Sequence, residues 1–134
     1  MTNQLFSIDT VELILFVSDQ ENSTKFYASL FDLEPCLYVT GMTEFQINSH
    51  IKLGLMPNDG IARLLQANIE HPDKAQGIPK CELYLHVSDI HKAFTHELSV
   101  GVKELSPILE RSWGDFACYF QDPDGHIIAF AERQ

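Results

Sequence analysis

The chain has 134 residues, 45% of them hydrophobic, and a formal net charge of −10 at pH 7. This hydrophobic content is enough to fill the core of one compact domain, which excludes a disordered chain. The acidic excess repels phosphate backbones, so we do not expect nucleic acid as a partner.

Membrane and secretion signals are not apparent in the sequence. No run approaches the roughly 18 apolar residues that a membrane-spanning helix needs, and the first residues, MTNQLFSIDT, lack the charged and apolar blocks of a signal peptide. We therefore expect a cytoplasmic protein without membrane contact. Three cysteines, Cys36, Cys81 and Cys118, are too few and too widely spaced for a disulfide framework or a Cys-based zinc site, and are interpreted as small buried hydrophobic residues.

The first predicted element is a strand over residues 11–17. Its residues alternate, with Val11 and Leu13 beginning one face and Glu12, Ile14 and Phe16 forming the other. A helix is predicted next, because Ser18 and Glu21 match a capping box and apolar residues recur at helical spacing up to Phe31. This helix should end at residues 33–35.

Two apolar runs, 37–47 and 51–56, flank the turn residues 48–50 and predict a meander of strands. Residues 57–80 are rich in Pro, Gly and charged side chains, which indicates a linker, with a short helix over 61–67.

The second half of the chain repeats the first. VELILFVSD, starting at residue 11, recurs as CELYLHVSD, starting at residue 81. A strand over 82–87, a helix that stops at Gly101, and strands near 102–105, 115–121 and 126–132 follow the same order, with a type I turn over 122–125. The helix carries an apolar stripe of Ile90, Ala93, Phe94 and Leu98. We predict one domain over 1–134, with module 1 at about 8–56, the linker at 57–80 and module 2 at about 81–133.

The repeat places a glutamate, Glu12 or Glu82, at the same point of each opening strand. A solvated strand face would explain a lone Glu, but such a face has no reason to be as apolar as this one. A carboxylate among aliphatic and aromatic groups is typical of a small-molecule site. The predicted lining residues are Ile14 and Phe16 beside Glu12, and Tyr84 and His86 beside Glu82. Trp113 precedes a strand and would either stack on the ligand or pack over the core.

These features together resemble the vicinal oxygen chelate superfamily, which includes glyoxalase I, bleomycin resistance proteins and extradiol dioxygenases. The resemblance rests on the paired strands ending in Val-Ser-Asp, the STKFY segment at 23–27, Trp113-Gly114, and YFQDPDGH at 119–126. It implies an α+β fold in which tandem βαβββ modules form a cupped mixed β-sheet with helices on the outer face. It also implies a homodimer and, in the enzymes, a divalent metal on the cup floor.

The resemblance places Glu12 and Glu82 at two of the family's metal-ligand positions and Ala129 at a third, where a carboxylate is usual. The remaining position falls in the 51–56 strand, which offers Lys52 and Gly54. A metal would then have two protein ligands at most, so no cofactor is firmly predicted.

Three functions remain open at this point. The first is a protein that binds a small cationic or amphipathic molecule in a cup containing Glu12 and Glu82, where two unmetallated carboxylates act as a clamp or a general base. The alternative is a divalent-metal-dependent lyase, isomerase or dioxygenase of the glyoxalase type with both glutamates as metal ligands and catalytic groups. The third is an interaction module whose own side chains fill the cup. Whether the cup forms within one chain or across a dimer also remains open.

Overall fold

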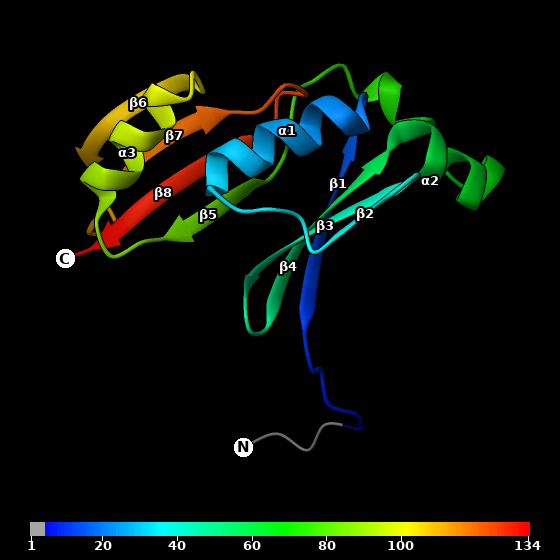
Figure 1. Ribbon diagram of the computed structural model, residues 1–134, viewed down its shortest axis with the longest axis horizontal. Helices are drawn as coiled ribbons and strands as arrows, with labels where there is room; N and C mark the ends of the chain where they lie inside the picture. Colours follow the sequence, from blue (N-terminus) through cyan, green and yellow to red (C-terminus); the bar gives the residue numbers. More distant parts are fainter. Residues whose placement is uncertain (1–4) are drawn as a thin grey trace.

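The computed structural model describes residues 5–134, and two modules with the same order of elements make up most of it (Figure 1). The first module contains β1 (Val11–Val17), α1 (Gln20–Phe31), β2 (Leu37–Val39), β3 (Met42–Asn48) and β4 (Ile51–Pro57). The second contains β5 (Glu82–His86), α3 (Ile90–Ser99), β6 (Lys103–Glu110), β7 (Asp115–Gln121) and β8 (Ile127–Arg133). The predicted α+β class with tandem βαβββ modules is confirmed.

Each module forms a four-stranded mixed sheet, ordered β1-β4-β3-β2 in the first and β5-β8-β7-β6 in the second. The opening strand of each module pairs in parallel with its last strand, and the other pairs are antiparallel. Parallel neighbours need a crossover connection, and the helix that follows each opening strand begins that crossover. The two sheets therefore have the same topology.

Both module helices begin at an aspartate. The Asp19 carboxylate accepts a hydrogen bond from the Asn22 amide, and the Asp89 carboxylate accepts one from the Lys92 amide. The predicted capping box with Ser18 is therefore wrong by one residue, because Asp19 is the stronger competitor for the exposed amides of the first turn. The repeated aspartate of the two VSD segments thus has a structural role.

Other elements begin or end away from their predicted positions. The run 37–47 is divided by a turn at Gly41, which has φ of +95°, and β6 continues to Glu110 through Pro107. Proline is tolerated there because β6 is an edge strand and its register is irregular. The linker helix, α2 (Asn58–Leu65), starts earlier than predicted and is followed by 3₁₀ turns over Gln66–Asn68 and Pro72–Ala75.

The apolar stripe of α3 also differs from the prediction. Ile90 and Glu97 are the buried residues of this helix, whereas Leu98 is 46% exposed. Glu97 lies two helical turns after Ile90 and therefore on the same side of the helix, so its carboxyl group is buried with it. The cysteine interpretation holds for Cys118, which is buried, but Cys36 and Cys81 are exposed.

The two modules share one hydrophobic core on the helix-covered faces of the sheets. The Tyr27 hydroxyl of α1 donates to Asp122 in the turn before β8 at 2.7 Å, and His96 Nε2 of α3 donates to the Ser29 carbonyl of α1 at 2.7 Å. The helices therefore meet between the modules, and the opposite face of each sheet stays open. Within residues 5–134, no helix has the length and apolar character needed to cross a membrane.

Candidate functional site

The open face of the first sheet carries Glu12. Glu12 is in register with Lys52 and Ile14 with Gly54, while Glu44 of β3 pairs with Gly54 from the other side. Paired residues project from the same face of a sheet. A Cβ atom on Gly54 would lie 2.5 Å from Oε2 of Glu12, so the missing side chain of this glycine provides the space for the carboxylate.

A second carboxylate shifts the acidity of Glu12. Partial burial raises the pKa of Glu12, and the hydrogen bond and negative charge of Glu44 raise it further, while the Lys52 charge opposes the shift. Lys52 Nζ lies 3.3 Å from Oε1 of Glu44. The neighbouring negative charge of Glu44 therefore disfavours the ionised form of Glu12 relative to an isolated glutamate. Beside it, Ile14 and Phe16 are 36% and 39% exposed, so this acidic group lies on a partly apolar surface.

The open face of the second sheet carries two tyrosines around the third family position. Tyr84 of β5, Ala129 of β8 and Tyr119 of β7 are in register across three strands. Ala129 is fully buried and offers only a methyl group. Burial and the charge of Glu82 raise the pKa of Tyr119, and Arg111, whose Cζ lies 5.0 Å from the Tyr119 ring centroid, opposes them. Glu82 is therefore part of an aromatic and polar surface.

Tyr84 connects several predicted site residues. Its hydroxyl donates to Oδ2 of Asp115 at 2.8 Å and accepts from Nε1 of Trp113 at 2.9 Å. The His86 ring lies edge-on to Tyr84, with a centroid distance of 5.2 Å. Trp113 is 58% exposed, so this hydrogen bond rather than core packing holds its indole. The structure thus brings Tyr84, His86 and Trp113 together.

The sequence analysis did not identify Asp115 and Arg133 as members of this group. They are partners in the β7–β8 register, and Arg133 lies 3.8 Å from Oδ1 of Asp115 and 3.4 Å from Nε2 of His86. Burial raises the pKa of Tyr84, Asp115 adds to the shift, and the Trp113 hydrogen bond opposes it. The signal that could have found them is their place in the predicted hairpin, since Asp115 begins one strand and Arg133 ends the other, which makes them partners at its open end.

The two predicted glutamates have separate surroundings. The groups that shift the pKa of Glu12 belong to the first sheet, and the tyrosine that Glu82 influences belongs to the second. Their joint action stays a prediction.

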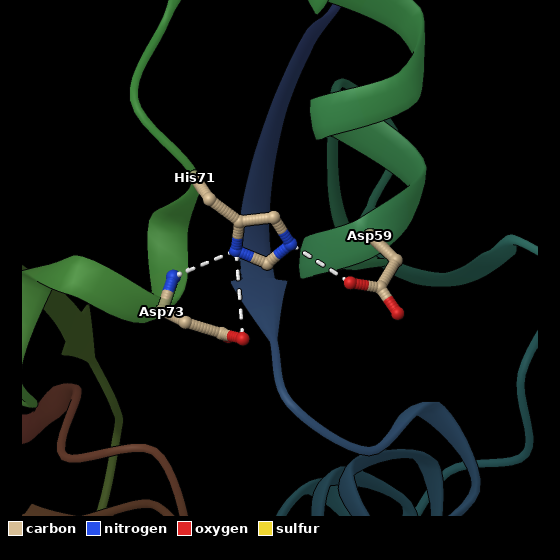
Figure 2. Close-up of side chains that lie close together, drawn as sticks. All are labelled: Asp59, His71 and Asp73. Carbon is tan, nitrogen blue, oxygen red and sulfur yellow. Dashed lines mark hydrogen bonds and ion pairs between the residues drawn. The ribbon is translucent and has the colours of Figure 1, made fainter.

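Among the described residues, one cluster brings together three side chains that could bind a metal: Asp59, His71 and Asp73 of the linker (Figure 2). Nε2 of His71 lies 2.8 Å from Asp59, whereas Nδ1 lies 3.5 Å from Oδ2 of Asp73 and accepts the Asp73 backbone N–H. The carboxylates thus face different nitrogens of the same ring. One ligand atom from each side chain lies within 4.8 Å of the others, but the carboxylates are already paired with the ring, and Oδ1 of Asp73 also accepts from Asn58. The arrangement is better suited to fastening the 3₁₀ turn to α2 than to coordination.

A divalent metal at the family position also finds too few ligands. Glu12 and Glu82 belong to no group of three metal-ligand side chains within residues 5–134, and the third position is the methyl group of Ala129. Catalytic zinc sites use three protein ligands. The residues present do not fit a catalytic metal centre.

Comparison with known proteins agrees with the fold. A protein of unknown function from Agrobacterium tumefaciens superposes with a TM-score of 0.76 at 22% identity, covering 98% of each chain. A glyoxalase-related enzyme from Fulvimarina pelagi gives a TM-score of 0.76 at 20% identity, covering 92% of this chain and 87% of that chain. A glyoxalase/bleomycin resistance protein/dioxygenase from Nocardioides gives 0.74 at 18% identity, covering 98% and 86%.

Sequence comparison defines the family. No curated protein matches the chain, but the family model of the glyoxalase-like domain matches residues 10–133. This match spans both modules and the linker between them. The chain therefore belongs to the glyoxalase-like domain family, within the vicinal oxygen chelate superfamily.

Proposed function

We propose that this protein binds a small cationic, amphipathic molecule on the open sheet faces, with Glu12 and Glu82 as the anionic groups and without a complete metal site. The observation that carries the proposal is the Glu12 carboxylate, which occupies the space above Gly54 beside Glu44 and is bordered by exposed Ile14 and Phe16. An ammonium group would place a positive charge beside the two carboxyl groups, and the apolar part of the ligand would cover the adjacent hydrophobic surface.

The aromatic groups of the second sheet complement this acidic surface. Tyr84 lies two residues after Glu82 on β5 and contacts the exposed Trp113, and aromatic rings bind organic cations through their quadrupoles. The Tyr84 hydroxyl is already engaged by Asp115 and Trp113, so the rings are held in place before a ligand arrives. This preorganisation lowers the entropic cost of binding.

A homodimer in the cytoplasm is part of the same proposal. Contact between α1 and α3 occupies the helix-covered faces, so the faces with Glu12 and Glu82 lie on the sides away from this contact. We propose that the first sheet of one copy faces the second sheet of another copy, which would close a cup around the ligand. Sedimentation of the full chain tests this arrangement, and a monomer at micromolar concentration would contradict it.

Isothermal titration with benzyltrimethylammonium tests the binding proposal. Its uncharged carbon isostere, neopentylbenzene, serves as the matched ligand, and loss of the charge interaction should weaken binding by about tenfold, equivalent to about 1.4 kcal/mol. Glu12→Gln and Glu82→Gln should remove this preference. Glu21→Gln, on the exposed surface of α1 with a side chain 71% accessible, is the control. Equal binding of the two ligands, or no binding by folded protein, would disprove the proposal.

Metal analysis distinguishes the proposed binding protein from the alternative, a metal-dependent enzyme. A lyase, isomerase or dioxygenase of the glyoxalase type would retain a divalent metal when purified without chelator. Because Ala129 supplies no ligand, we expect less than about a tenth of an equivalent of Ni, Zn, Mn, Fe or Co. A stoichiometric metal that is lost from both Glu12→Gln and Glu82→Gln would favour the alternative.

A further inference from the structure

The second module contains a buried carboxyl group that neither the fold nor the proposed function uses. Glu97 of α3 is 1% exposed, and its Oε1 has no hydrogen-bond partner among residues 5–134. Burial raises its pKa to about 8, so the neutral acid predominates at pH 7. Buried polar atoms in native proteins are nearly always hydrogen-bonded, and an exception calls for a physical explanation.

Glu97 lines a cavity between the two modules. The cavity is a groove that is open to solvent, with a volume of about 510 Å³, which is within the usual size range of small-molecule sites. Its walls come from both halves of the chain, on the helix-covered side rather than the open faces. The apolar lining includes Leu30, Phe31 and Ile47 of the first module and Leu85 and Phe130 of the second.

The other polar groups of the cavity indicate the charge of its ligand. Lys92, His96 and His86 also line it, and Lys92 and His96 lie one helical turn apart on α3. His96 Nε2 is already bonded to the Ser29 carbonyl, which leaves the Glu97 carboxyl as the polar group without a partner. The positive charge of Lys92 and the neutral Glu97 carboxyl group do not favour a cationic ligand. An uncharged molecule avoids both the repulsion and the cost of desolvating a charge.

We propose that this cavity is a second ligand site, which takes an uncharged, predominantly apolar molecule with one hydroxyl group and hydrogen-bonds that group to Glu97. A linear alcohol has the required parts. Its alkyl chain would be buried against the aliphatic and aromatic walls, and its hydroxyl would satisfy Oε1 of Glu97. The site differs from the proposed cation site in location, because it lies under the helices, and in ligand charge.

Binding of 1-hexanol to the full chain tests this proposal, with amide chemical shifts measured by NMR and hexane as the apolar control. Shifts should concentrate at Ile47, Leu85 and Phe130. Glu97→Gln keeps a hydrogen-bonding group of the same shape and should retain the affinity. Glu97→Leu should bind 1-hexanol about three- to tenfold more weakly, the loss of one hydrogen bond, and hexane no more weakly.

The outcome of the 1-hexanol experiment does not depend on the outcome of the titration with the ammonium ligand. No binding of 1-hexanol by the folded wild-type chain, unchanged affinity of Glu97→Leu, or shifts confined to Tyr84 and Trp113 would each overturn it. Circular dichroism of both variants establishes that they are folded. Failure of benzyltrimethylammonium binding would leave this result unaffected, because the two ligands occupy opposite faces of the sheets.

Discussion

The buried Glu97 should make the stability of this protein fall as pH rises. Its pKa is about 8 in the folded chain, against 4.5 for an ordinary glutamate. Between these values the folded state holds a proton that the unfolded state has released, so raising the pH favours unfolding. Each pH unit in this interval costs about 1.4 kcal/mol. From pH 5 to pH 8 the free energy of unfolding should therefore decrease by roughly 3 to 4 kcal/mol through this one group.

Glu97→Gln isolates the effect, because the amide has the same shape and does not titrate. Urea unfolding followed by far-ultraviolet circular dichroism at pH 5, 6, 7 and 8 gives both free-energy profiles. With a slope of about 2 kcal/mol per molar urea, the wild-type midpoint should lose about 2 M relative to the variant across this range. Other titrating groups, including His126, are common to both chains and cancel in the difference. Parallel profiles would refute the argument that Glu97 is protonated because it is buried without a partner.

Three further predictions concern the module contact and the Glu12 site. Tyr27→Phe removes one of the two side-chain donors that lie 2.7 Å from Oδ2 of the buried Asp122 and should lower the free energy of unfolding by about 1 to 3 kcal/mol in urea titration; an unchanged value would contradict the role of this bond. The His126–Asp122 hydrogen bond raises the pKa of His126, so its stabilisation is complete below about pH 6.5 and is lost as pH rises through the raised value. His126→Asn should therefore be most destabilising near pH 6, and a deficit that grows toward pH 9 would be inconsistent. Gly54→Ala places a Cβ 2.5 Å from a flexible carboxylate oxygen and should abolish the preference for the ammonium ligand in isothermal titration, whereas Gly60→Ala, with its nearest contact at 3.6 Å, should bind normally and be about 0.5 to 1 kcal/mol more stable.

Much of the fold could be predicted from the sequence because the pattern of strands and helix in the first module is repeated in the second. Strand alternation in VELILFVSD and CELYLHVSD identified the faces of β1 and β5. Successive side chains of a strand point to opposite faces of the sheet, and the apolar residues show which face is buried. The order of elements followed from the same repeat. The repeat did not show which of two neighbouring residues caps the first helix; the cap is Asp19 and not Ser18.

The candidate site was only partly predictable for a related reason. Tyr84, His86 and Trp113 were identified from single positions, but Asp115 and Arg133 enter the group through strand register, which depends on tertiary pairing. Glu97 was missed because a helical wheel ranks positions by hydrophobicity, and Leu98 ranks above it. In the folded chain the neighbouring module decides which position is enclosed, and that information is not local.

The hydrogen bonds between the modules bear on how the chain behaves as a unit. Tyr27 and the backbone amide of Ser18 both reach the turn before β8, bonding Asp122 and Asp124 respectively. Separation of the halves would break both of these bonds and expose the core that the halves share. A break in the peptide backbone of the linker would thus remove a tether, but the halves would still recognise each other as complementary fragments. The duplicated sequence encodes two similar structures that are built around one shared core.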